Sequence, residues 1–87
     1  MYSGKGRHFM TLQETEVGVS YRVKGLSLPV ELERRLEALG LIEGSQIFVL
    51  RKKRKGAMIV TVRGTRFAVG YAISTHITVE KGAAYGA

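Results

Sequence analysis

Leucines repeat at a helical spacing in the first half of the chain, at Leu32, Leu36 and Leu39. Positions i, i+4 and i+7 share one face of an α-helix, and the charged residues between them lie mostly off that stripe. The pattern predicts a short helix over residues 29–39, with Pro29 in its first turn. Gly40 is expected to end the helix in the left-handed conformation, with Leu41 packing back on Leu36 as in a Schellman cap. Because about three helical turns are not stable alone, this helix must dock on other elements.

Five further stretches alternate apolar and polar residues or are rich in β-branched side chains, which is typical of short strands. They are residues 20–26, 46–52, 57–63, 66–69 and 77–80. In the third stretch, Met58, Val60 and Val62 share an apolar face, while Thr61 and Arg63 share the opposite, wet face. This alternation predicts a sheet with one face buried and the other in water.

Glycines mark the connections between these strands. Residues 54–56 suit a hairpin turn in which Gly56 takes the left-handed position. Gly64 and Thr65 suit a second tight connection, and residues 70–75 suit a short turn or a single helical turn. Consecutive strands are therefore expected to pair antiparallel.

So many short strands in so few residues indicate a small barrel, because closing the sheet removes the edges that a flat meander exposes. The expected fold is mainly β: a small SH3-like antiparallel barrel of about five strands with one short helix. The length of 87 residues supports a single domain. We expect this domain to span residues 10–80 between flexible tails at 1–9 and 81–87, with Met10 as the natural start.

The charge of the chain is concentrated in one segment. The chain has 14 Lys and Arg against 7 acidic residues, a formal net charge of +7. Residues 51–66 contain no acid and carry seven of the cations, namely Arg51, Lys52, Lys53, Arg54, Lys55, Arg63 and Arg66. Such a patch favours an anionic partner, whether nucleic acid, an acidic protein face or lipid headgroups. The alternative is a solvated hairpin tip whose charges only prevent strand aggregation.

The chain carries no sign of a membrane span or a secretory signal. The longest uncharged run, residues 67–79, has 13 residues, short of the roughly 18 that indicate a transmembrane helix. No apolar stretch follows the basic residues at the N-terminus. Since cysteine is also absent, a reducing cytoplasm is the expected location.

Enzyme chemistry has few candidate residues here. The chain lacks Cys and Asp and has no phosphate-binding P-loop. Ser74 and His76 lie two positions apart, but we expect a turn serine and a surface histidine rather than a catalytic pair. His8 and His76 do not form a spaced metal-binding cluster, so no dedicated metal site or cofactor is predicted. Glutamates allow weak transition-metal binding at most.

Small barrels commonly bind single nucleic-acid strands or proline-rich peptides. For a single nucleic-acid strand, the basic run would contact phosphates, and Phe48, Phe67 or Tyr71 would supply stacking. The strand pattern, however, predicts Phe48 and Phe67 in the core. Proline-rich peptides are disfavoured because their groove uses exposed aromatics including a tryptophan, and the chain has none.

Much of the chain resembles the ferrous iron transport protein A (FeoA) family. The resemblance lies in residues 34–50, 60–69 and 76–80, and in the MTLQETEVG stretch at 10–18. The family motif R-L-x-x-L/M-G-h-x-x-G, where h is apolar, is matched by Arg35, Leu36, Leu39, Gly40, Leu41 and Gly44. The chain has Glu43 where the family usually has Pro, and Gly70 where it commonly has Arg.

The resemblance implies a cytoplasmic adaptor that docks on the G-protein domain of a membrane ferrous iron transporter, with ferrous iron as the ion of that system. In this hypothesis residues 51–55, Arg63 and Arg66 steer association, and Arg34 on the helix, with Glu33 and Glu37, tunes specificity. A basic barrel that binds RNA or single-stranded DNA is the alternative. A homodimer stays open, because the apolar hairpin strands could pair between copies.

Overall fold

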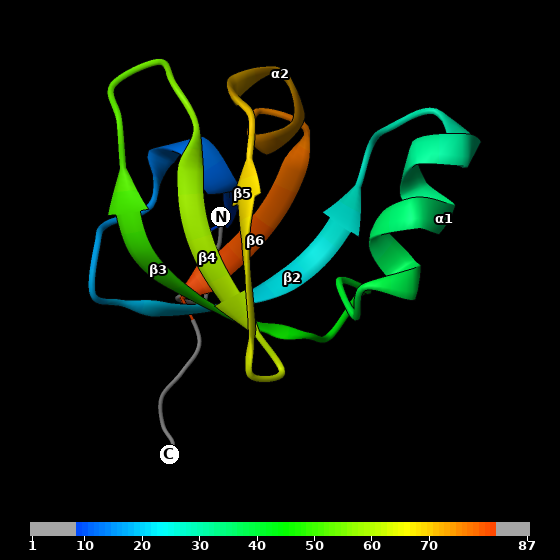
Figure 1. Cartoon of the computed structure of the whole chain (residues 1–87), viewed down its shortest axis with the longest axis horizontal. Helices are drawn as coiled ribbons and strands as arrows, with labels where there is room; N and C mark the ends of the chain where they lie inside the picture. Colours follow the sequence, from blue (N-terminus) through cyan, green and yellow to red (C-terminus); the bar gives the residue numbers. More distant parts are fainter. Residues whose placement is uncertain (1–8, 82–87) are drawn as a thin grey trace, which may run out of the picture.

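Six antiparallel strands form one curved sheet in the computed structural model, which describes residues 9–81 (Figure 1). The strands are β1 (Phe9–Thr11), β2 (Ser20–Leu26), β3 (Gln46–Lys52), β4 (Met58–Val62), β5 (Thr65–Val69) and β6 (Ile77–Lys81). They lie in the order β1-β6-β2-β3-β4-β5. Three short helices accompany them, namely η1 (Leu12–Glu14), α1 (Val30–Ala38) and α2 (Tyr71–Ser74). The mainly β class predicted from the sequence is confirmed.

The additional strand β1 begins at Phe9, the last residue of the predicted N-terminal tail, and pairs with β6. Lys81, the first residue of the predicted C-terminal tail, is likewise the last residue of β6. The remaining predicted tail positions, residues 1–8 and 82–87, lie outside the described residues. Sheet curvature arises at two register shifts, between Val23 and Gly25 and between Val49 and Arg51. Within residues 9–81 the hydrogen-bonded order ends at β1 and at β5, so the expected full closure of the sheet is not reached.

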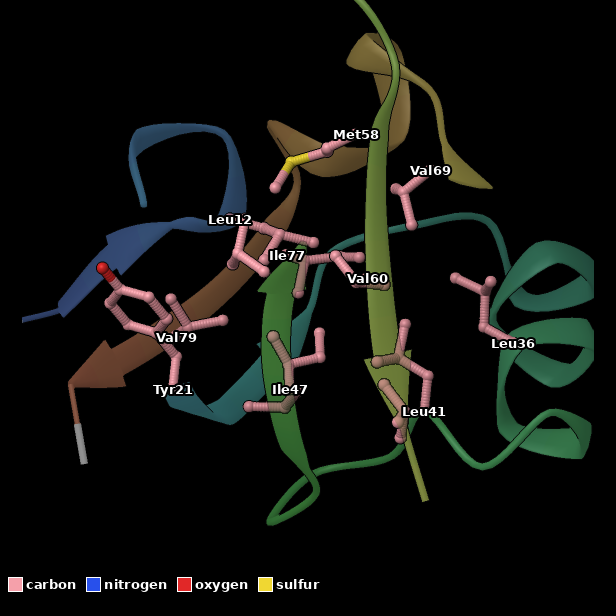
Figure 2. Close-up of a cluster of buried hydrophobic side chains, with 13 residues drawn as sticks. Leu12, Tyr21, Leu36, Leu41, Ile47, Met58, Val60, Val69, Ile77 and Val79 are labelled. Carbon is pink, nitrogen blue, oxygen red and sulfur yellow. The ribbon is translucent and has the colours of Figure 1, made fainter. Parts of the chain in front are cut away.

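The core lies inside this curved sheet and draws residues from nearly every element (Figure 2). In β4, Met58, Val60 and Val62 are fully buried, whereas Ile59 and Thr61 between them are only partly buried, as the alternation predicted. The whole buried cluster comprises Leu12, Tyr21, Val23, Leu36, Leu41, Ile47, Val49, Met58, Val60, Val62, Val69, Ile77 and Val79. The side chains of β4 that point into this cluster define its inner face, so Ile59 marks the outer face.

Helix α1 ends as the sequence predicted. Its start differs by one residue, because Pro29 is the N-cap residue just before the helix and does not lie in the first turn as predicted. At the other end the Leu41 N–H donates to the Leu36 carbonyl (3.0 Å) and the Gly40 N–H to the Glu37 carbonyl (2.9 Å). These are the two hydrogen bonds of a Schellman motif, and Gly40 has the expected left-handed φ of 100°. The chain therefore returns to the core directly after the helix.

The leucine stripe is buried only in part. Leu36 lies in the core, but Leu39 is 46% exposed, so its predicted place on the buried face is wrong. The reason is that α1 stands to one side of the sheet (Figure 1), and Leu41, after the turn, fills the core position instead.

Both hairpin turns differ from the prediction by one residue. In the β3–β4 turn it is Lys55, with φ 54°, and not Gly56, that adopts the left-handed conformation. Gly56 is needed for a different reason, since a Cβ there would lie 3.0 Å from the Lys53 Cβ. In the β4–β5 turn Arg63 and Gly64 both have positive φ, and they join the paired residues Val62 and Thr65. This is a two-residue type I′ turn, so Arg63 belongs to the turn and not to the wet face of β4.

Gly40 supports a first testable prediction. Its backbone is left-handed, and a Cβ added to it would lie 3.1 Å from the Arg63 Cδ. We expect Gly40→Ala to lower the free energy of unfolding by about 1–2 kcal/mol, because an L-residue is strained in this conformation. Urea denaturation followed by circular dichroism measures this loss.

The matched control is Gly25→Ala, because a Cβ at Gly25 would meet no atom within 4 Å and its φ is not positive. This variant is expected to change stability by less than about 1 kcal/mol. Equal losses from the two substitutions would contradict the role given to Gly40.

Candidate partner-binding surface

The predicted basic residues fall into separate groups in space. The β3–β4 turn lies at one end of the sheet and the β4–β5 turn, which carries Arg63, at the other (Figure 1). Arg34 is exposed on α1, which stands to one side of the sheet (Figure 1). The segment of residues 51–66 is thus continuous in sequence but does not form one surface.

The exposed residues Lys53, Arg54 and Lys55 form the tip of the β3–β4 hairpin, here called the basic tip. The chain reverses there through Lys55, and the Gly56 N–H donates to the Lys53 carbonyl (3.0 Å). Three adjacent cations on one tight turn give a local positive potential that raises encounter rates with anionic surfaces.

Lys52 has a different role from its neighbours. Its ammonium donates to the Gln13 carbonyl (2.9 Å) and to the Thr15 carbonyl, and thereby ties β3 to η1 and to the residue that follows it. Thr15 is itself buried, with its hydroxyl donating to the Leu12 carbonyl (2.6 Å). The charge of Lys52 is thus engaged within the chain, which the sequence did not reveal.

Arg63 is also associated with another element. Its side chain lies against Gly40, at the C-terminal end of α1. A cation at this end of a helix interacts favourably with the partial negative charge of the last carbonyl groups. Arg63 therefore has a structural environment of its own, apart from the basic tip.

Arg51 and Arg66 are brought together on the outer face of the sheet. Arg51 on β3 pairs with Ile59 on β4, and Ile59 pairs with Ala68 on β5. In the neighbouring row of the outer face, Thr61 on β4 pairs with Arg66 on β5. The two exposed arginines border a hollow of about 570 Å³, here called the outer groove. Its lining residues are Leu50, Arg51, Ile59, Arg66, Phe67 and Ala68.

The outer groove continues toward the basic tip. A second hollow of about 490 Å³ shares Arg51 and Ile59 with the first and adds Lys52, Lys53 and Ala57. Sequence reasoning missed Ile59 as a surface residue. Its position between the inward-facing Met58 and Val60 was the available signal, because alternation along a strand places it outside.

Phe48 differs from the prediction. It lies between the buried Ile47 and Val49, so its side chain faces outward and is 37% exposed, which makes its predicted core position wrong. Phe67 is partly buried and packs against the core. Tyr71, the third aromatic weighed for stacking, is exposed in α2.

The structure separates Ser74 from His76. Ser74 is buried in α2 and its hydroxyl donates to the Gln13 Oε1 (2.7 Å), whereas His76 is exposed with its Nδ1 2.9 Å from the Ala72 carbonyl oxygen. The predictions of a turn serine and a surface histidine are thereby confirmed. No group of three or more His, Asp or Glu side chains among residues 9–81 could hold a metal ion, and His8 lies outside that range.

The part of the chain in the structure contains no helix long and apolar enough to cross a membrane. Its fold defines a small SH3-like β domain, and its exposed side chains include the cations of the basic tip and of the outer groove. The model of the FeoA domain matches residues 10–81, and the chain belongs to this family. The family is associated with ferrous iron transport, and its members are accessory proteins rather than enzymes.

Solved structures agree with this assignment. An iron uptake regulatory protein (FeoA) is 27% identical, with a TM-score of 0.77 over 84% of this chain and 97% of its own. The FeoA protein of Chlorobium tepidum is 28% identical, with a TM-score of 0.79 over 88% and 74%. FeoA of Stenotrophomonas maltophilia, a zinc complex described as an SH3 domain protein, is 25% identical, with a TM-score of 0.69 over 80% and 88%.

A manganese-dependent transcriptional repressor shares the fold over 88% of this chain and 44% of its own, at 18% identity and a TM-score of 0.78. No protein with a curated description is significantly similar to this chain in sequence.

Proposed function

We propose that this protein is a cytoplasmic accessory subunit of ferrous iron uptake that docks on the G-protein domain of the membrane ferrous iron transporter. The observation that carries the proposal is that the FeoA domain spans residues 10–81, nearly all of the described fold. Ferrous iron is then the cargo of the transporter and not a resident cofactor of this chain. Docking is the activity that the exposed surfaces support.

The basic tip supports an electrostatic contribution to docking. Lys53, Arg54 and Lys55 are exposed, and no acid occurs between residues 51 and 66. Charges at the rim of an interface mainly increase the association rate and make it sensitive to salt. Arg34, with Glu33 and Glu37 on α1, offers a second contact surface that would tune specificity.

A charge reversal at the basic tip tests this function. We expect the Lys53→Glu/Arg54→Glu variant to associate with the purified G-protein domain about tenfold more slowly than the unaltered chain at low salt, with the difference shrinking at high salt. Biolayer interferometry with the immobilised G-protein domain gives both rate constants.

Lys81→Glu is the matched control, because Lys81 is an exposed lysine at the far end of β6 from the basic tip. It should leave the association rate nearly unchanged. The absence of any binding by the unaltered chain would refute the proposed function, and equal rates for all variants would refute the role of the tip.

Nucleic-acid binding is the second candidate function, and the outward position of Phe48 favours it. Phe48 aligns with Thr61, and Thr61 with Arg66, so an aromatic ring and a cation share the outer face. Binding of a single strand by such a surface would weaken steeply with salt. A titration with oligouridine in increasing salt separates this function from docking on a protein.

A further inference from the structure

The outer groove has the dimensions of a binding site. Its volume of about 570 Å³ lies within the range of roughly 300–1,000 Å³ that is usual for ligand pockets. Together with the adjoining hollow toward the basic tip, it forms an elongated depression over β4. Because the two hollows share only Arg51 and Ile59 and follow one another, they suit an extended chain better than a compact small molecule.

The groove has cations at its borders and aliphatic groups at its floor. Arg51 on β3 and Arg66 on β5 are exposed on either side of β4, and Ile59 lies between these strands. None of the lining residues of either hollow is acidic. A complementary ligand therefore carries carboxylates at its sides and an aliphatic side chain between them.

The floor distinguishes a peptide from a nucleic acid. Bases bind to protein surfaces largely by stacking on aromatic rings. Among the lining residues Leu50, Ile59 and Ala68 are aliphatic, and the one aromatic residue, Phe67, packs against the core. The exposed Phe48 is not a lining residue. An aliphatic floor gains more from burying an Ile, Leu or Val side chain.

The geometry points to the outer groove as a binding site for an acidic, extended segment of the partner protein. Carboxylates of the segment pair with the guanidinium groups of Arg51 and Arg66, and an aliphatic side chain packs on Ile59. Arginine suits this role because its planar guanidinium binds a carboxylate through two parallel hydrogen bonds. The inference rests on the proposed function and specifies the chemistry of the docking contact.

The test uses a fluorescein-labelled peptide of alternating Glu and Ile residues as its probe, with the full chain as receptor. We expect the peptide to bind the unaltered chain, with binding falling as salt rises, and the Arg51→Glu/Arg66→Glu variant to bind at least about tenfold more weakly. The matched control, Arg35→Glu/Lys81→Glu, reverses two exposed cations that lie outside the groove and the basic tip, and it should bind as the unaltered chain does. Fluorescence anisotropy measures the affinities.

Two further measurements distinguish the loss of a binding contact from misfolding of the charge-reversed variant. Amide shifts of the unaltered chain on peptide addition should be largest at Leu50, Ile59 and Ala68, and the Arg51→Gln/Arg66→Gln variant should also bind weakly. No binding of the peptide, shifts confined to other parts of the chain, or oligouridine binding more tightly to the same residues would each overturn the inference.

The same variants are also tested on the purified G-protein domain. If this domain binds the unaltered chain and the Arg51→Glu/Arg66→Glu variant equally, the groove inference fails while the proposed function stands. If the domain does not bind but the acidic peptide does, the proposed function fails and the groove remains a peptide site.

Discussion

Replacing Leu41 by alanine is expected to lower the free energy of unfolding by about 3 kcal/mol, within the range measured for buried leucines. Leu41 is fully buried and packs in the central cluster, where the alanine would leave a cavity (Figure 2). It also anchors the chain directly after the Schellman motif of α1. For a domain of this size the loss corresponds to a melting temperature lower by about 12 °C or more. Thermal unfolding followed by circular dichroism measures the shift.

Leu39→Ala is the control for this prediction, because Leu39 lies two residues earlier in the same motif and is 46% exposed. Its loss should stay below about 1 kcal/mol, since little apolar area leaves the interior. A melting temperature that falls equally in both variants would contradict the burial assigned to the two leucines.

Replacing Lys52 by methionine is expected to lower stability by about 2 kcal/mol, as for the loss of a hydrogen bond to a charged group. The ammonium of Lys52 donates hydrogen bonds to the carbonyl oxygens of Gln13 and Thr15, and the variant would leave both acceptors without this partner. Urea denaturation of the variant measures the effect.

Lys53→Met provides the comparison, because Lys53 is the next residue and is exposed on the basic tip. A surface substitution of this kind usually changes stability by no more than about 0.5 kcal/mol. For association with the partner we expect the opposite order of effects, with Lys53→Met slowing association more than Lys52→Met. If the two lysines proved equally important for stability, the role given to Lys52 in joining β3 to η1 and Thr15 would be wrong.

The elements set by local patterns were predictable from the sequence. Strands β2 and β3 have the predicted limits, and the end of α1 follows from Gly40 and Leu41, whose roles depend on residues nearby in the chain. Strand β1 was missed because its three residues show no clear period and are stabilised by pairing with the distant β6. The barrel class was predicted, but the open order of strands depends on such distant pairings.

The candidate site was predictable in composition but not in arrangement. The excess of cations in residues 51–66 is visible in the sequence, but the direction of Lys52 depends on carbonyl groups 37 and 39 residues away. The contact between Arg63 and Gly40 likewise joins a turn to a helix end. The placement of Arg51 and Arg66 at the same hollow depends on the register of both hairpins, and one residue more or fewer in a turn would change that register.

Helix α1 contributes one fully anchored side chain of its own, Leu36, to the buried cluster, while Val30 at its start and Leu39 after its end are exposed. Local opening requires little free energy where few apolar contacts are lost. We therefore expect α1 to open locally at a lower free energy than the paired strands, with the chain bending before Pro29 and after Gly40. A partner bound to α1 would contact an element that can change its position, whereas a partner bound to the outer groove would contact the paired strands β3, β4 and β5.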